Sequence, residues 1–139
     1  MAHIIDSFSG EYRFLSNFYP CQITYQGWSY PSVEHAYQAA KCKIDKEKAA
    51  VRAAPTPGRA KALGQKVQVR SDWETVKVGI MKELVALKFK DPELRKLLDE
   101  TGDTKLIEGN TWGDKFWGVC EGHGKNVLGK ILEWVRNNE

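Results

Sequence analysis

The sequence predicts a mostly helical α+β fold in a single domain of 139 residues. Helix start signals followed by helical apolar spacing recur after residue 30, whereas a β-hairpin pattern is confined to the residues before it. A chain of this length buries about two thirds of the surface that it exposes when unfolded. We therefore expect residues 1–139 to form one domain with a short N-terminal β-hairpin and minor strands.

The composition is that of an ordinary globular protein, with 42% hydrophobic and 28% charged residues. A formal charge of +3 is too small to argue for general nucleic-acid binding, but it suits an anionic ligand. No apolar run approaches the length of a membrane span, and the N-terminus lacks the pattern of a signal peptide. The sequence therefore predicts a cytoplasmic protein without membrane contact, in which Cys21, Cys42 and Cys120 are free thiols.

The N-terminal region predicts extended chain and loop. Residues 11–19 alternate around aromatic side chains, and residues 22–30 predict a hairpin that turns at Gln26-Gly27. The motif RFLSNFYP (Arg13–Pro20) is expected to be a loop, because aromatic residues flank a serine and an asparagine and a proline follows. Its aromatic rings either anchor this loop in the core, which is the favoured interpretation, or stack on a planar ligand.

Helix signals continue through the rest of the chain. Predicted helices cover residues 32–43, 45–54, 56–63, 73–90, 92–98 and 127–136, with a short strand at 105–108. Thr56 is expected to be an N-cap with Pro57 at the first helical position, and Asp72 is expected to cap the longest helix. Trp73, in the first turn of that helix, is either a core residue or the wall of a pocket.

The central feature is the helix that begins after Ser32, within YPSVEHAYQAAK (Tyr30–Lys41). Glu34, Gln38 and Lys41 fall on one stripe of this helix. A carboxylate in the first turn is stabilised by the positive end of the helix, which favours its ionised form. The ordinary explanation of such a stripe is a solvated face with a surface ion pair. The alternative is an active site.

The last third is rich in glycine, with the segment GNTWGDKFWGVCEGHGKNVLGK at residues 109–130. Such density indicates positive φ angles or close approach to a ligand. We expect the amides near residues 122–126, with Arg13 or Lys125, to form an anion site at the start of the final helix. The segment lacks the Ser or Thr of a P-loop and the spacing of a dinucleotide fingerprint. No cysteine or histidine has partners at metal-site spacing, so neither a metal nor a cofactor is predicted.

With these motifs in order, the chain resembles the NADAR family, also called YbiA-like. The resemblance extends from about Phe8 to Arg136. It rests on FLSNFYP (14–20), YPSVEHAYQAAK (30–41), Asp72-Trp73 with Lys77 and Met81, Lys88-Phe89, Leu97-Leu98 with Thr101, Asp114-x-x-Trp117-Gly118, and Gly124-x-Asn126-x-Leu128-Gly129.

The resemblance implies a mostly helical α+β, YbiA-like domain that hydrolyses N-glycosidic bonds between a ribose and an amino group on a base-like ring. By motif position, it implies that Glu34 is the catalytic glutamate, that Asp114 is the family's aspartate and that Lys41 lines the pocket. Because Lys41 lies on the same helix face as Glu34, we expect it to be a third catalytic residue, either covalent or electrostatic. Two carboxylates suit this chemistry, because the sugar gains positive charge and the leaving base needs a proton. Expected substrate-binding residues are Arg13, Phe14, Ser16, Asn17, Phe18, His35, Tyr37, Gln38, Trp73, Trp117, Gly118 and Asn126.

Several alternatives stay open at this level. The favoured substrate is ADP-ribose attached to guanine, in a nucleotide or in nucleic acid, and the second is a ribosylamino-pyrimidine phosphate of riboflavin biosynthesis. A third interpretation is a module that binds ADP-ribose or a nucleotide without cleaving it. The protein is expected to be a monomer that is functionally paired with an ADP-ribosyltransferase. Its role as an antitoxin, a repair enzyme or a metabolic enzyme is undecided.

Overall fold

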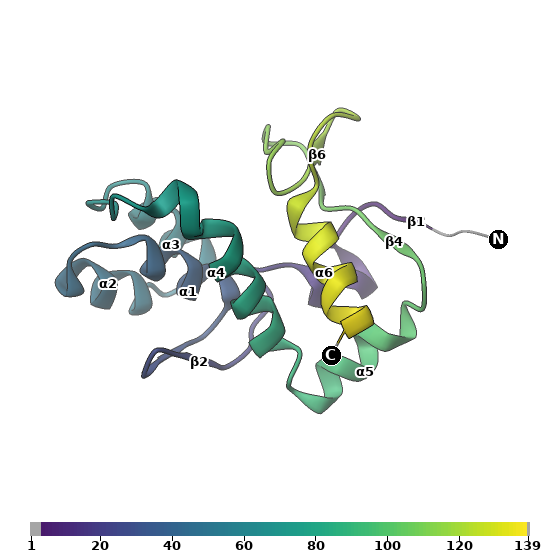
Figure 1. Ribbon diagram of the computed structural model, residues 1–139, viewed down its shortest axis with the longest axis horizontal. Coiled ribbons are helices and arrows are strands. Elements are labelled where there is room, and N and C mark those ends of the chain that lie inside the picture. The colour runs from purple at the N-terminus through teal and green to yellow at the C-terminus, as the bar shows by residue number, and fades with distance from the viewer. Residues whose placement is uncertain (1–3, 139) are drawn as a thin grey trace. The chain divides into compact units, whose positions relative to one another are not determined.

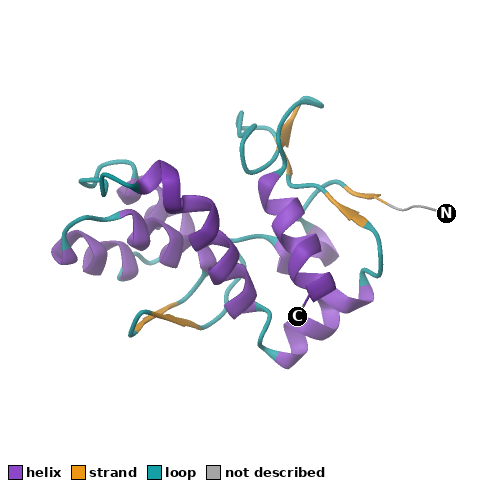
Figure 2. Cartoon of the chain, in the orientation of Figure 1, coloured by secondary structure: helices purple, strands orange, loops and turns teal. Residues whose placement is uncertain are grey.

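The computed structural model describes residues 4–138 and is mostly helical, with strands that pair only in two-stranded sheets (Figures 1 and 2). In chain order the elements are β1 (Ile4–Ile5), the 3-10 helix η1 (Gly10–Leu15), β2 (Ile23–Tyr25), β3 (Trp28–Tyr30), α1 (Val33–Lys41), α2 (Asp45–Arg52), α3 (Pro57–Gly64), α4 (Trp73–Lys88), α5 (Pro92–Glu100), β4 (Lys105–Leu106), β5 (Gly109–Asn110), β6 (Val119–Cys120) and α6 (Val127–Asn138).

The described chain divides into two compact units. The central unit comprises residues 17–88, and the terminal unit comprises residues 4–16 together with 89–138. Each is described by itself.

In the central unit, α1 packs against α2, α3 and α4. Neighbours on three sides explain why every residue from Val33 to Ala39 is buried. Strands β2 and β3 form the predicted hairpin, pairing Ile23 with Tyr30. Its turn residues Gln26 and Gly27 have φ angles of 51° and 84°, which is the left-handed pair of a tight hairpin turn.

Two predicted caps start helices in this unit. The Ser32 hydroxyl accepts a hydrogen bond from the His35 amide at 3.0 Å and begins α1. The Thr56 hydroxyl accepts from the Arg59 amide at 3.1 Å, with Pro57 at the first helical position of α3. The Asp72 carboxylate bonds the Arg70 guanidinium through both oxygens, at 2.6 and 3.0 Å, at the start of α4.

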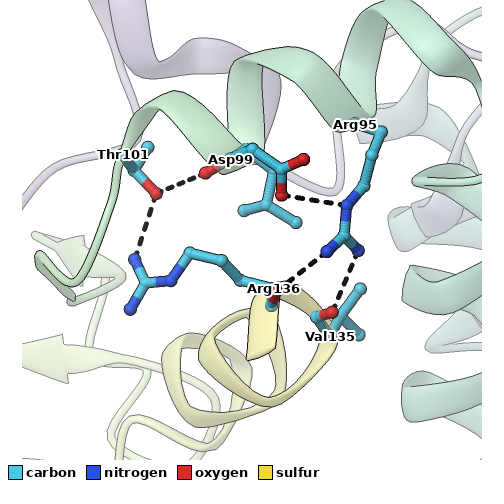
Figure 3. Close-up of polar contacts among 6 residues, drawn as sticks. Arg95, Asp99, Thr101, Val135 and Arg136 are labelled. Atoms are coloured by element: carbon cyan, nitrogen blue, oxygen red, sulfur yellow. Dashed lines mark hydrogen bonds and ion pairs between the residues drawn. The ribbon is translucent and has the colours of Figure 1, made fainter. Parts of the chain in front are cut away.

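The terminal unit is built around α6, which packs against β4, while α5 packs against η1. Strand β4 pairs in parallel with β1, and β5 pairs in parallel with β6. Figure 3 shows how polar side chains join α5 to α6. The Arg95 guanidinium donates to the carbonyls of Val135 and Arg136 at 3.0 and 2.8 Å, and Arg136 donates to the Thr101 hydroxyl at 3.0 Å.

The N-terminal expectation was partly wrong. The alternation across residues 11–19 predicts extended chain, yet Gly10–Leu15 forms a 3-10 helix in which Phe14 and Leu15 are buried. Short runs of aromatic and apolar residues fit both periods, and packing against α5 decides between them. Strands β1, β5 and β6 escaped prediction because two-residue strands depend on distant partners rather than on local sequence.

Candidate active site

Glu34 lies in the first turn of α1, and it is only 8% exposed. Its amide donates to the carbonyl oxygen of Asn17 at 3.1 Å, so the RFLSNFYP loop is attached to the start of the helix. One carboxylate oxygen accepts a hydrogen bond from the Gln38 side-chain amide at 2.7 Å. A carboxylate taken out of water in this way is held by the helix end and by a specific donor.

Gln38 joins Glu34 to Lys41. Gln38 is 6% exposed, and its side-chain oxygen accepts a hydrogen bond from the Lys41 ammonium at 3.4 Å. Glu34, Gln38 and Lys41 thus form a connected polar row, here called the α1 stripe. Because Glu34 and Gln38 are buried, the interpretation of this stripe as a solvated surface face is wrong.

Lys41, at the end of α1, is half-buried. Burial lowers the pKa of its ammonium group below the usual 10.5, while the negative charge of Glu34 acts in the opposite direction. A lowered pKa increases the fraction of neutral, nucleophilic amine near neutral pH. Lys41 therefore has the electrostatic environment for either a charge-stabilising or a nucleophilic role.

Gly64, the last residue of α3, lies directly against the Gln38 side chain. A Cβ atom at this position would overlap the side-chain oxygen of Gln38. The absence of a side chain therefore lets α3 approach α1 closely enough to hold Gln38 against Glu34. Its contact with Gln38 depends on tertiary packing, which a local sequence pattern does not encode.

Tyr37 and Trp73 form a buried aromatic pair between α1 and α4. Their ring centroids are 5.0 Å apart with an interplanar angle of 53°, and the two residues are 8% and 5% exposed. Of the two interpretations left open for Trp73, the structure places it in the core. The pair fixes the packing of α4 against the helix that carries Glu34.

His35 is buried and uses both ring nitrogens inside the central unit. Its Nε2 lies 2.9 Å from the Ala54 carbonyl oxygen, and its Nδ1 lies 2.7 Å from the Ser32 hydroxyl. Because a carbonyl only accepts, Nε2 carries the proton, and Nδ1 accepts from the hydroxyl in the neutral ring. The contacts of His35 are therefore those of a residue that holds the start of α1, which the motif alone did not distinguish from ligand binding.

The RFLSNFYP residues are divided between the two units. In the central unit, Asn17 lies beside α4, with its side-chain nitrogen 3.5 Å from the Met81 sulfur, and Phe18 is 43% exposed. In the terminal unit, Arg13 is exposed, Ser16 ends η1, and Phe14 is buried. Phe14 lines a cavity of about 560 Å³ between β1, η1 and α5.

Asp114 organises a loop of the terminal unit. One carboxylate oxygen accepts from the amides of Phe116 and Trp117 at 3.1 and 2.9 Å, and Asn110 bonds both the amide and the carbonyl of Asp114. The half-buried Trp117 ring packs edge-on against Phe116 at a centroid distance of 4.9 Å. Gly118 is buried where a Cβ would overlap Glu108.

Asn126 precedes α6 with a φ angle of 54°. Its side chain accepts from the Glu108 amide at 3.0 Å and donates to the Leu106 carbonyl at 2.9 Å. These bonds tie the end of β4 to the start of α6.

The anion site expected before α6 is not supported. The amides of residues 125–128 donate to the carbonyls of Lys115, Gly118, Phe116 and Trp117 at 2.8–3.3 Å. Amides that are already bonded offer little to a phosphate. The glycine-rich segment thus uses its backbone freedom to fold on itself, and Lys125 lies over the Phe116 ring.

Within residues 4–138, no group of three or more His, Cys, Asp or Glu side chains is arranged to hold a metal ion. In the same residues, no helix is long and apolar enough to span a membrane.

Fold and geometry together define a small, mostly helical α+β protein whose central helix holds a buried carboxylate, a buried amide and a half-buried lysine in one row. The NADAR domain model matches residues 6–138, and the chain belongs to the NADAR family.

Three proteins similar to this chain have names that state an activity or a pathway. This chain is 43% identical over 132 residues to N-glycosidase Npun_R5314 of Nostoc punctiforme, and the match covers 90% of this chain and 84% of that protein. It is 42% identical over 127 residues to riboflavin biosynthesis protein VVA0006 of Vibrio vulnificus, but it spans only 34% of that longer protein. The E. coli N-glycosidase YbiA is 36% identical over 134 residues, which are 94% of this chain and 83% of that one.

The solution NMR structure of E. coli YbiA has the same fold, with a TM-score of 0.86 at 35% sequence identity over 99% of this chain and 85% of that one. The expectation of a mostly helical, YbiA-like fold with small sheets is therefore confirmed.

Proposed function

We propose that this protein is an N-glycosidase that removes ADP-ribose from the amino group of guanine. The observation that carries the proposal is the α1 stripe, in which a buried carboxylate lies in a hydrogen-bonded row with an amide and a lysine. The names of the relatives in Nostoc and E. coli support N-glycosidase activity as the general class.

The reaction breaks the bond between ribose C1 and the amino nitrogen of the base. Water supplies the oxygen that ends on C1, and a proton is delivered to the leaving nitrogen. Positive charge builds on the sugar as the bond lengthens, so an ionised Glu34 stabilises the transition state or removes a proton from the water. Gln38 holds the carboxylate at 2.7 Å and so limits its reorganisation during the reaction.

Lys41 has two candidate roles. In the first, its charge holds Glu34 or a substrate phosphate in place. In the second, its amine attacks C1 of the ring-opened, imine-like sugar, releases the base and forms a Schiff base that water later hydrolyses. The lowered pKa of Lys41 supports the second role, and its row with Gln38 and Glu34 supports the first.

A borohydride trap separates the two roles of Lys41. A covalent role predicts a reduced sugar adduct on Lys41, detected by peptide mass after borohydride is added during turnover. If no adduct forms while the base is being released, and Lys41→Arg retains substantial activity, Lys41 acts through its charge alone.

The charge distribution supports an anionic substrate. Residues 17–88 contain 12 Lys and Arg against 6 Asp and Glu, a formal charge of +6, whereas the rest of the sequence carries 9 against 12, a formal charge of −3. The overall formal charge of +3 is therefore the sum of a basic central unit and an acidic remainder. A pyrophosphate such as that of ADP-ribose is attracted to such a unit over a distance of about 10 Å.

A ribosylamino-pyrimidine phosphate is the second candidate substrate, favoured by the name of the Vibrio vulnificus relative. Incubation with ADP-ribosylated guanosine and with this phosphate, each followed by chromatography, tests the proposal. Release of guanosine from the first supports it, and release of base from the second alone favours the alternative. Binding of ADP-ribose without release from either compound would make the protein a recognition module.

By motif position we propose Asp114 as a catalytic residue and Trp117 and Asn126 as substrate-binding residues. These roles are independent of the α1 stripe. Asp114→Asn keeps an oxygen for the amides of Phe116 and Trp117 while it removes the charge. A large fall in kcat with an unchanged melting temperature would support a catalytic Asp114. Loss of stability alone would assign it to the loop.

A further inference from the structure

Lys88 is the last residue of α4, and it is only 2% exposed. Lysine is rarely buried to this degree unless its ammonium group has a specific environment. Its Nζ lies 5.8 Å from the centroid of the Tyr19 ring, within the range of a cation–π contact. Tyr19 belongs to the RFLSNFYP loop, so the buried lysine contacts a segment that carries predicted substrate-binding residues.

The Asn17–Cys21 segment is attached to the start of α1 at both ends. The Asn17 carbonyl accepts from the Glu34 amide, and the Cys21 amide donates to the Pro31 carbonyl, each at 3.1 Å. A displacement of the segment therefore changes the surroundings of Glu34 directly.

Helix α4 contacts the same segment at two points, two turns apart on one helix face. Met81 lies 3.5 Å from the Asn17 side-chain nitrogen, and seven residues later Lys88 lies under the Tyr19 ring. The segment is thus held between α1 and α4, and the Lys88 contact is the one that involves a charge.

We propose that Lys88 is a positioning residue, whose side chain packs against the Tyr19 ring, holds the Asn17–Cys21 segment against the start of α1 and so sets substrate affinity. The link to affinity rests on the proposed function, whereas the holding of the segment does not.

The Lys88 contact depends on pH. Burial lowers the Lys88 pKa to about 7, and the Cys21 thiol acts in the opposite direction. Tyr19 and Cys21 are the titratable groups of the segment. On β2, which packs against α4, Tyr25 is titratable, and its charge partners are Glu83 and Arg70. Because the pKa is lowered by burial, loss of the proton favours the arrangement in which Lys88 is buried, so the segment is held more tightly as the pH rises through about 7.

Lys88→Met removes the charge and keeps most of the side-chain volume, and Lys90→Met, at an exposed position just after α4, is the matched control. At pH 8 we expect the KM of Lys88→Met to be about tenfold above that of the wild type with kcat within threefold, and the amides of Glu34 and Cys21 to exchange with solvent faster. Between pH 6 and 8 the KM of the wild type should fall, because loss of the proton favours the buried lysine, whereas the KM of Lys88→Met should stay constant. Lys90→Met should match the wild type throughout.

Tyr19 provides a second route that leaves Lys88 in place. Tyr19→Phe keeps the ring and should behave as the wild type, whereas Tyr19→Leu should reproduce the effects of Lys88→Met. Wild-type amide exchange and a wild-type KM profile in Tyr19→Leu would overturn the proposal, as would equal effects from Lys90→Met. If Lys88→Met exchanges these amides faster, but the wild type cleaves neither ADP-ribosylated guanosine nor the ribosylamino-pyrimidine phosphate, the positioning role stands and the proposed function is rejected.

Discussion

At the scale of single residues, burial sets the chemistry of the charged groups on α1 and α4. Glu34 and Lys88 are both under 9% exposed. The carboxylate of Glu34 lies at the positive end of α1 and accepts a hydrogen bond from Gln38. Lys88 faces an aromatic ring, and burial displaces its pKa to about 7.

The lowered pKa of Lys88 predicts a pH dependence of stability. Its unfolded pKa is near 10.5 and its folded pKa about 7, so between these values the unfolded state binds more protons than the folded state. The free energy of unfolding should therefore rise with pH in this window, by about 1.4 kcal/mol per pH unit at most from this one group.

Urea denaturation between pH 7 and 8.5 measures this slope below the range in which Tyr25 and Tyr30, whose pKa values are raised by burial, begin to titrate. Lys88→Met should remove most of the slope. An unchanged slope in Lys88→Met would show that other groups cause it.

At the scale of elements, α1 is placed by what surrounds it. Helices α2, α3 and α4 enclose it, and the close approach of α3 depends on Gly64. The polar row on α1 is thus kept in register by helix packing as well as by its own hydrogen bonds.

Gly64→Ala tests this packing. The new methyl group would overlap the Gln38 side chain and displace it from the Glu34 carboxylate, so we expect kcat to fall about tenfold, with a small loss of thermal stability. The measurements are steady-state kinetics and the melting temperature.

Gly79→Ala is the control, because a Cβ at Gly79 on α4 meets nothing within 4 Å. It should keep full activity and gain roughly 0.5–1 kcal/mol of stability from helix propensity. Equal kcat values for Gly64→Ala and Gly79→Ala would show that the position of Gln38 does not affect catalysis.

Sequence reasoning predicted elements well where local signals are strong. The caps at Ser32 and Thr56 and the turn at Gln26-Gly27 are each confirmed, because their hydrogen bonds and φ angles depend on neighbouring residues. Strands of two residues, the 3-10 helix and the contact of Gly64 depend on partners far along the chain, and local patterns do not encode them. The carbonyls that accept from the amides of Lys125 and Asn126 also lie earlier in the chain, at Lys115 and Gly118, and local patterns do not encode them.

For the site, the spacing of Glu34, Gln38 and Lys41 predicted their common row, which the hydrogen bonds confirm. Whether that row is solvated or buried was not encoded locally, since it depends on three packed helices. Residue type likewise did not reveal the contacts that His35 and Trp73 make inside the central unit, and their binding roles stay predictions.

At the scale of the whole molecule, charge is distributed unevenly, with a formal +6 in residues 17–88 and −3 in the remainder. Such a distribution favours encounter of the central unit with phosphate groups, and salt screens this attraction.

For ADP-ribosylated guanosine we therefore expect KM to increase several-fold between 50 and 500 mM NaCl at nearly constant kcat, and to change less for ribosylated guanine without phosphates. Initial rates with both substrates measure this. Identical salt dependence for the two would argue against recognition of phosphate by the basic unit.

The central claim is that Glu34 drives cleavage of an N-glycosidic bond, and the most direct measurement is guanosine release from ADP-ribosylated guanosine by the wild type and by Glu34→Gln. Glutamine keeps the size of the side chain and removes its charge. We predict that the folded variant binds ADP-ribose nearly as the wild type does while its turnover falls by roughly two to four orders of magnitude. A folded Glu34→Gln that releases guanosine at close to the wild-type rate would contradict the claim.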